Sequence, residues 1–393
     1  MPLLRRLPYG SSLAIGLACA ALALAWQALT VRFNYGGNWT GLYCTGSNQR
    51  IPSDLLSERI YALPNSNGFD GQFYHYIAHD PLARTQLHNF IDAPRLRYRR
   101  ILVPGLAFVL AAGSPQYIDA AYYAIVLLFV FLGGYWLSRF AVLHQRHPAW
   151  GLLFLAFPSV LTSIDRMTVD VALAAFWAGF AVYAAIGGRR RLYVLLVLAP
   201  LARETGLAIA GTYCLWALWN KDVARAARSI AAVVPCLVWY LYLQRSLGPD
   251  TSPWAALQSQ GLFAAIVHPF PYPWSTAVNM LVIAADYLAL AAPLAAVILS
   301  FRLGVTRTAG VLEFAAVLQG ALGSVLVLFG SRDIWVHVYG YARVLSPLFI
   351  LLALRSLERR TWKDLVPLPL LMPRIGLQFG SHVLAVLRGV LSL

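Results

Sequence analysis

A short polar stretch in an otherwise apolar chain carries side chains that can do acid–base chemistry. It reads GFDGQFYHYIAHDP over residues 68–81 and contains Asp70, His75, His79 and Asp80. An Asn-Ser-Asn-Gly turn precedes it, so we expect Asp70 to open a short amphipathic helix. Its carboxylate can serve as a general base, although a simple helix N-cap is the alternative. For His75, His79 and Asp80 we expect helix-surface or helix-ending roles, because a proline follows at once and limits the helix.

A run of arginines follows in the same polar region. RLRYRRILVP, residues 95–104, holds four arginines in six residues and no lysine. The guanidinium fork binds phosphate oxygens in pairs, so Arg97 and Arg100 are candidates for holding a phosphate. A solvated charge run and an anchor for anionic lipid headgroups are the alternatives.

Three more polar segments interrupt the apolar runs further along the chain. Arg203 and Glu204 lie in LARET, Arg343 ends the segment 331–343, and DRMTVD occupies residues 165–170. Ionisable residues at membrane depth are costly and are usually functional. Structural ion pairs are the alternative for the Arg203–Glu204 pair and for DRMTVD.

The composition indicates what kind of protein holds these segments. Of 393 residues, 59% are hydrophobic and only 12% are charged, with a mean hydropathy of +0.63, whereas a soluble domain is about 25% charged. Long apolar runs separated by short Arg-containing loops are typical of a polytopic helical membrane protein. The net charge of +15 does not indicate nucleic-acid binding, because most of it falls in loops beside membrane helices. The four cysteines show no CxxC or Cys/His spacing, so we expect neither a disulfide nor a structural zinc site.

Segment length and loop charge together predict about ten transmembrane helices. The expected spans lie near residues 11–31, 117–140, 149–163, 168–187, 192–202, 205–220, 228–246, 277–301, 309–330 and 341–357. The apolar segment 101–112 is too short to cross, and we interpret it as an interfacial or re-entrant helix. Both termini are then cytoplasmic, and the basic loops fall inside, as the positive-inside rule requires. These loops are 139–147, 187–191, 220–228, 302–308 and 358–363.

The predicted fold class is therefore an all-α polytopic membrane protein that forms one domain, residues 1–393. A large first outer loop, residues 32–116, would bring Asp70 and the arginine run to the same membrane surface. Residues 364–393 would form a C-terminal tail lying on the membrane. No HExxH, P-loop, GxSxG or GxGxxG motif occurs, so Arg side chains would hold any phosphate. An acid beside such a site favours a transferase with a lipid-phosphate donor.

The arrangement resembles the GT-C superfamily of glycosyltransferases, which use polyprenyl-phosphate sugars. Those proteins place an essential acid in the first outer loop, beside interfacial helices and a multi-span bundle. The local match is closer to a group of bacterial inner-membrane proteins with DGQFYY, RYxRILxP and LxRET segments. Here these read DGQFYH from Asp70, RYRRILVP from Arg97 and LARET from Leu201, with His75 in place of the second Tyr. The resemblance covers residues 1 to about 357.

The resemblance implies an inverting glycosyltransferase at the periplasmic face of the bacterial inner membrane, with Asp70 as the catalytic base. The residues expected to bind the donor phosphate are Arg97, Arg100, Arg203 and Arg343. Those expected to contact substrate are Gln72, Tyr74, Tyr98 and Glu204, the last of which would also orient Arg203. The partners would be a polyprenyl-phosphate sugar donor, a glycan, lipid or protein acceptor, and membrane lipids, with no nucleic acid. No DxD pair is present, so no metal or other cofactor is expected, although a cation between Asp70 and Asp80 stays open.

A transporter or flippase for a lipid-linked substrate is the alternative function. It predicts inverted repeats and spans broken by Gly or Pro in both halves of the chain, and the apolar segments show neither. A non-catalytic membrane scaffold is a third possibility, but it leaves the convergence of polar segments unexplained.

Overall fold

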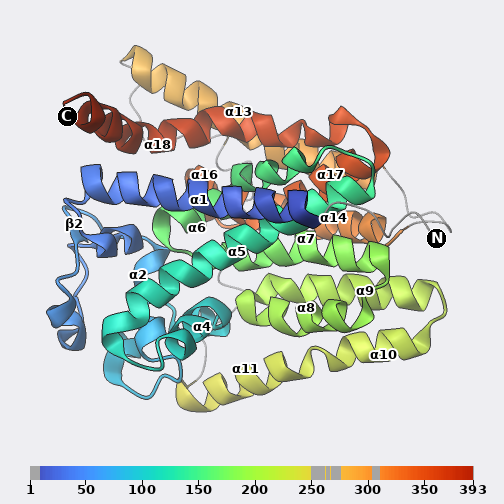
Figure 1. The fold of residues 1–393 in the computed structure, drawn as a ribbon, viewed down its shortest axis with the longest axis horizontal. Coiled ribbons are helices and arrows are strands. Elements are labelled where there is room, and N and C mark those ends of the chain that lie inside the picture. The colour runs from blue at the N-terminus through green and yellow to red at the C-terminus, as the bar shows by residue number, and fades with distance from the viewer. Residues whose placement is uncertain (1–8, 249–261, 263–265, 267–275, 303–309, 393) are drawn as a thin grey trace.

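The computed structural model describes residues 9–248, 262, 266, 276–302 and 310–392, without the side chains of Tyr9, Arg332 and Asp333. Within these residues the chain is almost entirely helical (Figure 1). The strands described are two short ones, β1 (Thr45–Gly46) and β2 (Ala62–Leu63), which pair in parallel. The predicted all-α class is confirmed for this part of the chain. Of the expected loop 302–308, only Arg302 lies among the described residues.

The α-helices are α1 (Tyr9–Asn34), α2 (Asp70–His79), α3 (Pro94–Arg99), α4 (Leu102–Leu110), α5 (Pro115–Leu143), α6 (Pro158–Arg166), α7 (Asp170–Ile186), α8 (Arg189–Ala202), α9 (Leu207–Trp219), α10 (Val223–Ala231), α11 (Val234–Ser246), α13 (Ala277–Phe301), α14 (Val311–Phe329), α15 (Arg332–Val336), α16 (Val338–Val344), α17 (Ser346–Arg359) and α18 (Pro367–Leu391). The 3-10 helices are η2 (Trp39–Tyr43), η3 (Ser53–Glu58), η4 (Gln86–Phe90), η5 (Pro148–Ala156), η6 (Glu204–Gly206) and η8 (Trp362–Leu365).

Six segments in the described part of the chain are long and apolar enough to cross a membrane. They are α1, α5, the α10–α11 unit, α13, α14 and the η8–α18 unit. Two bent pairs, η5–α6 and α16–α17, raise the number to eight if each pair is one span. The ten predicted spans stay a prediction, because α7, α8 and α9 have only 17, 14 and 13 residues, and a span needs about 20.

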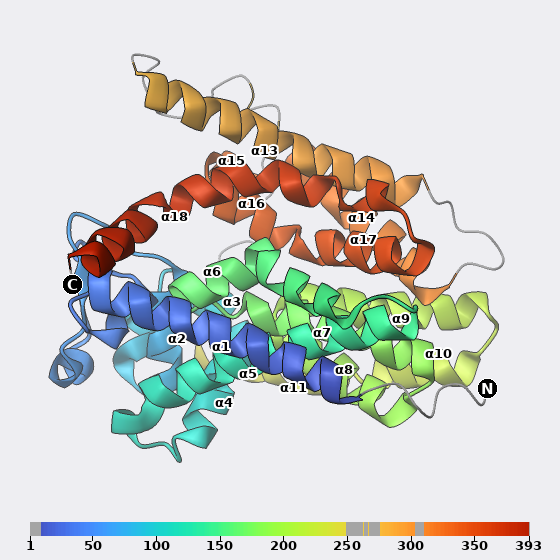
Figure 2. The same ribbon diagram turned by 45° about the horizontal axis from the view of Figure 1, so that its top comes forward.

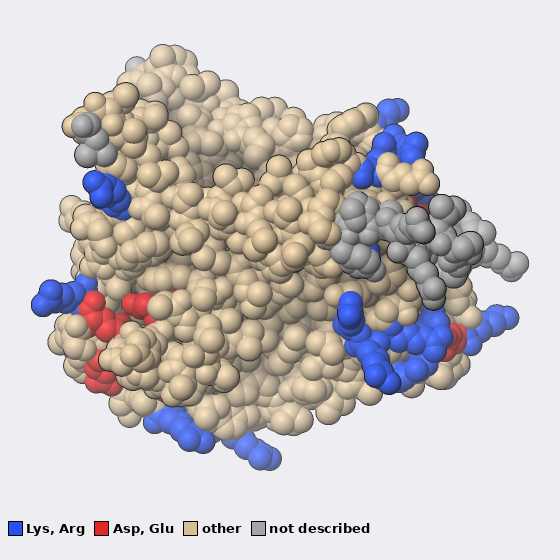
Figure 3. Space-filling model, viewed as in Figure 1, with Lys and Arg blue, Asp and Glu red and all other residues tan. Residues whose placement is uncertain are grey.

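The helices form two layers. Figure 2 shows α13, α14, α16, α17 and α18 lying over a layer that contains α1, α5, α7, α8 and α9. The short α4 packs against α2 and α5 at one end of the bundle, and with nine residues it agrees with the prediction that 101–112 does not cross. On the face drawn in Figure 3, Lys and Arg side chains gather toward the two ends of the bundle, and the middle is mostly uncharged.

Two helix pairs are broken by proline, which corrects the expectation that no span is interrupted. Pro158 opens α6 after η5, and the axes of the two helices differ by 64°. Pro347 lies in the first turn of α17, which is bent by 56° from α16. A proline disfavours helical geometry at the residue before it. The breaks adjoin each other, since the Ser159 amide donates a hydrogen bond to Ser346 Oγ at 2.9 Å. Each of these two apolar runs contains one proline, at the break. Hydropathy alone therefore predicts one continuous helix for each run.

The C-terminal segment differs from the expected membrane-surface tail. Helix α18 packs along α13 and α1 and is long and apolar enough to cross. Its internal Arg374 is buried and binds Asp286 of α13, with Nε 2.5 Å from Oδ1. This pairing compensates the charge of Arg374 within the apolar segment. Asn34, the last residue of α1, donates a hydrogen bond to the carbonyl of His382 in α18, so the start of α1 and the end of α18 lie at opposite ends of the bundle (Figure 1), not on one side as predicted.

Candidate functional site

Two glycines place the start of α2. Gly68 has a φ of +76°, a left-handed conformation that suits glycine. A Cβ on Gly71 would stand 2.1 Å from the carbonyl oxygen of Arg166, so this position must be glycine for α2 to lie against the end of α6. Asp70 is the first residue of α2, and Phe69, which has no capping group, occupies the N-cap position. The N-cap alternative for Asp70 is therefore wrong.

The carboxylate of Asp70 is held by two arginines. Arg97 contacts both of its oxygens, with Nη2 3.0 Å from Oδ1 and Nη1 2.9 Å from Oδ2. Arg343 Nη2 lies 2.7 Å from Oδ2. Burial alone would raise the pKa of Asp70, but Arg343 and Arg97 outweigh it and hold the pKa well below its ordinary value. Asp70 is therefore a carboxylate when no substrate is bound.

The other predicted arginines belong to adjoining ion pairs. Arg100 binds Glu204 through two hydrogen bonds, 2.8 and 2.7 Å long, and donates a third to Tyr74 Oη at 2.9 Å. Arg203 pairs with the buried carboxylate of Asp170, the first residue of α7. The separation between Arg203 Nε and Glu204 Oε1 is 3.7 Å.

One further contact joins these pairs to the first group. Arg343 Nε lies 3.6 Å from Asp170 Oδ2, while its other end binds Asp70. The structure thus brings together the charged residues predicted from four separate segments. Asp170 lies in the DRMTVD segment and was assigned no individual role from the sequence. Asp92, which binds Arg97 at 2.9 Å, was missed because a single loop acid has no distinguishing pattern.

A cavity of about 300 Å³ opens onto Asp70. Its wall includes Asp70 and Arg343 and also Arg166, the second residue of DRMTVD. The Arg166 guanidinium stacks over the rings of Phe69, at 3.7 Å, and Tyr339, at 4.6 Å. Rings of this kind, facing a polar cavity, are suited to covering a sugar. The remaining lining residues are Thr162, Thr168, His337, Val338, Gly340 and Gln378.

None of the four predicted substrate contacts lines this cavity, and Glu204 is paired with Arg100 as described above. Gln72 accepts a hydrogen bond from the Gly46 amide and donates one to the carbonyl of Asn67, so it holds the loop before α2. Tyr74 is buried and accepts the hydrogen bond from Arg100. Tyr98 is buried too and is not among the residues that line the cavity. The proximity of Gln72 and Tyr74 to Asp70 in sequence did not carry over to the cavity, because α2 beyond its first residue packs into the protein.

The two histidines of α2 belong to a separate cluster. His75 is fully buried, which corrects its expected surface role, whereas His79 is the last residue of α2, as predicted. His75 and His79 meet Glu58 of η3 and Asp119 of α5. Burial would lower the pKa of His75, but Asp119 and Glu58 raise it to about 9. Burial and the charge of His75 lower the pKa of His79 to about 4. The i, i+4 spacing of the histidines signals a shared helix face, but Glu58 and Asp119 have no such signal.

Asp80 has the helix-ending position predicted for it. It is the C-cap residue of α2, and its carboxylate accepts hydrogen bonds from the backbone amides of Arg84, at 2.9 Å, and Thr85, at 2.6 Å. These bonds fix the turn that leads from α2 toward η4. Asp80 is therefore engaged in this turn and does not share a site with Asp70.

An apolar groove is lined by residues that neighbour Arg100 and Arg203 in the chain. It has a volume of about 410 Å³. Ile101 directly follows Arg100, and Leu201 lies two residues before Arg203, so the groove ends beside the charged network. Its lining residues are Leu82, Ile101, Leu201, Pro235, Val238, Trp239 and Tyr242.

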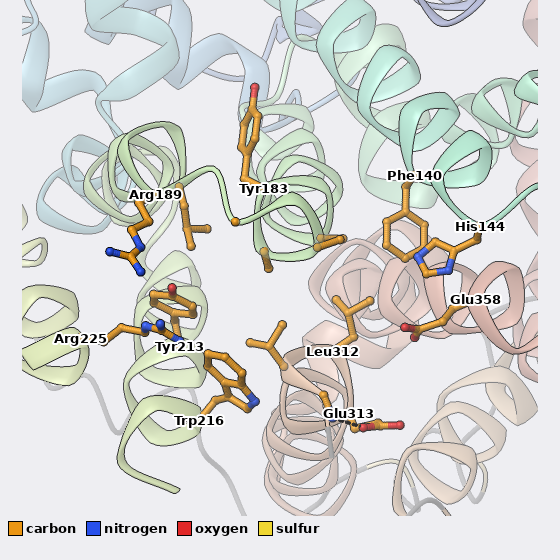
Figure 4. Close-up of a pocket in the computed structure, with 17 residues that line it drawn as sticks. Phe140, His144, Tyr183, Arg189, Tyr213, Trp216, Arg225, Leu312, Glu313 and Glu358 are labelled. Carbon is orange, nitrogen blue, oxygen red and sulfur yellow. Dashed lines mark hydrogen bonds between the residues drawn. The ribbon is translucent and has the colours of Figure 1, made fainter. Parts of the chain in front are cut away.

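A cavity of about 550 Å³ lies toward the opposite end of the bundle, between the ends of α5, α7, α9, α14 and α17 (Figure 4). Figure 4 shows Arg189 and Arg225 on one side of it and Glu313 and Glu358 on the other. None of the predicted site residues lines this cavity. Its size alone therefore does not make it the reaction site, and the chemistry described above lies at the Asp70 end.

Comparisons with protein-family models, with curated proteins and with solved structures find no match for this chain.

Proposed function

We propose that the protein is an inverting glycosyltransferase that moves a sugar from a polyprenyl-phosphate-linked donor to an acceptor hydroxyl. The observation that carries the proposal is the cavity in which the carboxylate of Asp70 faces Arg343 and Arg166. An acid and cations on one cavity wall suit a reaction in which a hydroxyl loses a proton while a phosphate leaves. The resemblance to GT-C enzymes supports the same reaction, and the GT-C-like fold is part of this proposal.

In the proposed reaction the acceptor oxygen attacks the anomeric carbon of the donor sugar. Its proton passes to an oxygen of Asp70 as the new C–O bond forms. The bond between the anomeric carbon and the phosphate oxygen breaks, and its electron pair stays on the phosphate. Arg343 and Arg166 stabilise the charge that grows there. A single displacement inverts the anomeric centre, with Asp70 accepting the proton and Arg343 and Arg166 supplying the cationic contacts.

The ion pairs around Asp70 suit this sequence of events. A carboxylate held by two arginines is a weak base, because each guanidinium favours its ionised form. A donor phosphate that binds Arg343 competes with Asp70 for the same guanidinium. Its arrival therefore raises the basicity of Asp70 at the moment an acceptor must lose its proton. Arg97, which is anchored by Asp92, keeps the carboxylate in place.

The apolar groove beside Arg100 fits the lipid part of such a donor. We assign it to the isoprenoid chain nearest the phosphate, because its lining is almost wholly apolar and it ends at the Arg100–Glu204 pair. In this arrangement Arg100 and Arg203 lie between the chain and the cavity at Asp70, where the donor phosphate would pass.

The proposal includes an orientation. Short basic loops follow α7 and α9, and in Figure 1 these connections lie at the opposite end of the bundle from α2, which begins with Asp70. The positive-inside rule makes that end cytoplasmic, and the Asp70 end would then face the periplasm of a bacterial inner membrane. About ten spans, with α7, α8 and α9 crossing in spite of their length, would complete this topology, and α18 would add one more.

One observation favours the alternative, a transporter or flippase for lipid-linked substrates. The broken pairs η5–α6 and α16–α17 lie in different halves of the chain and meet at their breaks, and broken helices that meet at a binding site are typical of transporters. We nevertheless prefer the transferase, because one cavity wall holds both a carboxylate that can accept a proton and cations that can stabilise a leaving phosphate.

The test is an assay of the purified protein in liposomes. A polyprenyl-phosphate donor with a radiolabelled sugar is supplied together with a membrane extract as the source of acceptor. Formation of a labelled product with release of polyprenyl phosphate supports the transferase. Movement of the intact donor across the bilayer without product would favour the flippase and contradict our proposal. Empty liposomes and a heat-denatured sample provide the baselines for both product formation and donor movement.

A further inference from the structure

The cluster of two histidines and two carboxylates has the ligand set of a metal site. His75 and His79 lie one turn apart on the same face of α2, Glu58 ends η3, and Asp119 lies in the first turns of α5. One ligand atom from each residue can be chosen so that all four lie within 4.8 Å of one another. The four residues come from three segments of the chain, so no short sequence motif reveals them.

Four of the separations within the cluster, two of them to different oxygens of Glu58, are close to those of a tetrahedral site. His75 Nε2 lies 2.9 Å from Asp119 Oδ1, 3.2 Å from Glu58 Oε2 and 3.3 Å from His79 Nε2, and His79 Nε2 lies 3.1 Å from Glu58 Oε1. With zinc–ligand bonds of about 2.0–2.2 Å, the ligand atoms of a tetrahedron lie about 3.3–3.6 Å apart. The observed distances are within a few tenths of an ångström of these.

Hydrogen bonding alone does not account for this arrangement. His75 Nε2 can carry one proton, yet two carboxylate oxygens and the nitrogen of His79 all lie within 3.3 Å of it. Glu58 Oε2 and Asp119 Oδ1 are buried and have no hydrogen bond of acceptable geometry among the described residues. Buried polar atoms usually have a partner. A divalent cation would satisfy all four ligand residues at once and neutralise the two carboxylates.

We propose that Glu58, His75, His79 and Asp119 bind a divalent transition metal of the zinc class. Imidazole and carboxylate ligands suit zinc and related first-row metals. The site is structural, because four protein ligands leave no open position for a substrate. His75 is fully buried beneath the ring of Tyr43, whose centroid lies 4.1 Å away.

The metal would fix the helix that carries the proposed base. It ties η3, α2 and α5 together, and Asp70 lies five residues before His75, about 7.5 Å along the helix axis. The proposal does not depend on glycosyl transfer, since it concerns how this end of the bundle is held together. It replaces the expectation, drawn from cysteine spacing, that no structural metal is present.

The first experiment measures metal content. The full-length protein, purified in detergent with a tag that contains no histidine, is analysed by inductively coupled plasma mass spectrometry. We expect about one zinc-class ion per chain in the wild type. His75→Ala and His79→Ala should lose it, whereas the matched control His147→Ala, which changes an exposed histidine elsewhere, should keep it. Wild-type protein without stoichiometric metal, or full retention in both α2 variants, would overturn the proposal.

A second measurement separates metal loss from failure to fold. Wild-type protein stripped with a chelator is titrated with Co²⁺, which gives intense visible bands when it is tetrahedral. Glu58→Gln keeps the size of the side chain and should bind Co²⁺ at least about tenfold more weakly. If the histidine variants do not fold, the Co²⁺ spectrum of the wild-type protein alone tests the metal site. Tetrahedral bands that saturate at one equivalent support the site, and an octahedral spectrum or no saturable binding contradicts it.

Discussion

Arg97 binds both carboxylate oxygens of Asp70, at 3.0 and 2.9 Å, and its guanidinium also forms an ion pair with Asp92. Residues that are 27 positions apart in the chain thereby fix one another at the mouth of a cavity. This geometry keeps the carboxylate oriented, and it leaves Arg343 as the partner that a substrate phosphate can compete for. Each prediction below follows from this arrangement or from the helices that support it.

The pH dependence of stability should reveal the ionised state of Asp70. Its pKa is lower in the folded protein than the ordinary value of 3.8, so the ionised group stabilises the fold above that value and loses this contribution as the pH falls below it. We expect the difference in unfolding temperature between wild type and Asp70→Asn to be constant between about pH 7 and pH 5 and to shrink below about pH 4. A difference that already shrinks between pH 7 and pH 5 would contradict the lowered pKa.

The two cavity arginines should matter for the transfer rate. Arg166→Gln and Arg343→Gln each remove a cation from the wall where the leaving phosphate is placed, so kcat/KM for the lipid-linked donor should fall by about 10²–10³. Arg50→Gln, which changes an exposed arginine of the predicted outer loop that carries Asp70, is the control and should leave the value unchanged. Equal, small effects for all three substitutions would place the donor phosphate elsewhere.

The buried pair between α13 and α18 should show strong coupling. Arg374→Leu leaves Asp286 buried and without its partner, and losing one member of such a pair costs about 3–5 kcal/mol. Replacing both residues, Asp286→Leu with Arg374→Leu, should restore most of the unfolding temperature, because no charge then remains buried. Thermal unfolding in detergent measures the cycle. Additive losses in the double variant would show that the pair does not form.

The direction of α18 can be tested by chemical labelling. In a background without the native cysteines, Ser392→Cys should react with an impermeant maleimide from the same side of the membrane as Ser53→Cys, since α18 ends beside the end of α1. Ser53 lies in the predicted first outer loop and serves as the reference. Labelling of the two positions from opposite sides would return the C-terminus to the cytoplasmic side and contradict a crossing α18.

Much of the charged network could be predicted from sequence. Asp70, Arg97 and Arg343 stand out because each is a charge beside an apolar run, and such charges must find partners when a bundle forms. The cavity residue Arg166 was harder to recognise, since its role depends on the aromatic rings that two other segments bring to it. Gln72 was assigned to substrate for its position in a motif, whereas its amide is used to hold a loop.

The helical class was predictable, and the interruptions were not. Mean hydropathy over a window does not register a single proline, so the breaks before Pro158 and Pro347 were hidden in apolar runs. The partner of Arg374 in α18 could not be predicted, because Asp286 lies 88 residues away in the chain. The cluster at His75 was missed for a similar reason, since two of its four members come from distant segments. Long-range pairing decided the last two cases, and a single local proline decided the breaks.

The most direct test of the proposed function is a single-turnover transfer assay that compares wild type with Asp70→Asn. Purified protein is mixed with a radiolabelled polyprenyl-phosphate sugar and an acceptor, and the rate of product formation and its anomeric configuration are measured. We predict an inverted product, with a rate that falls by about 10²–10⁴ in Asp70→Asn and is unchanged in Asp54→Asn, an exposed acid of the same loop. Undiminished transfer by Asp70→Asn, or retention of the anomeric configuration, would contradict Asp70 as the base of an inverting glycosyltransferase.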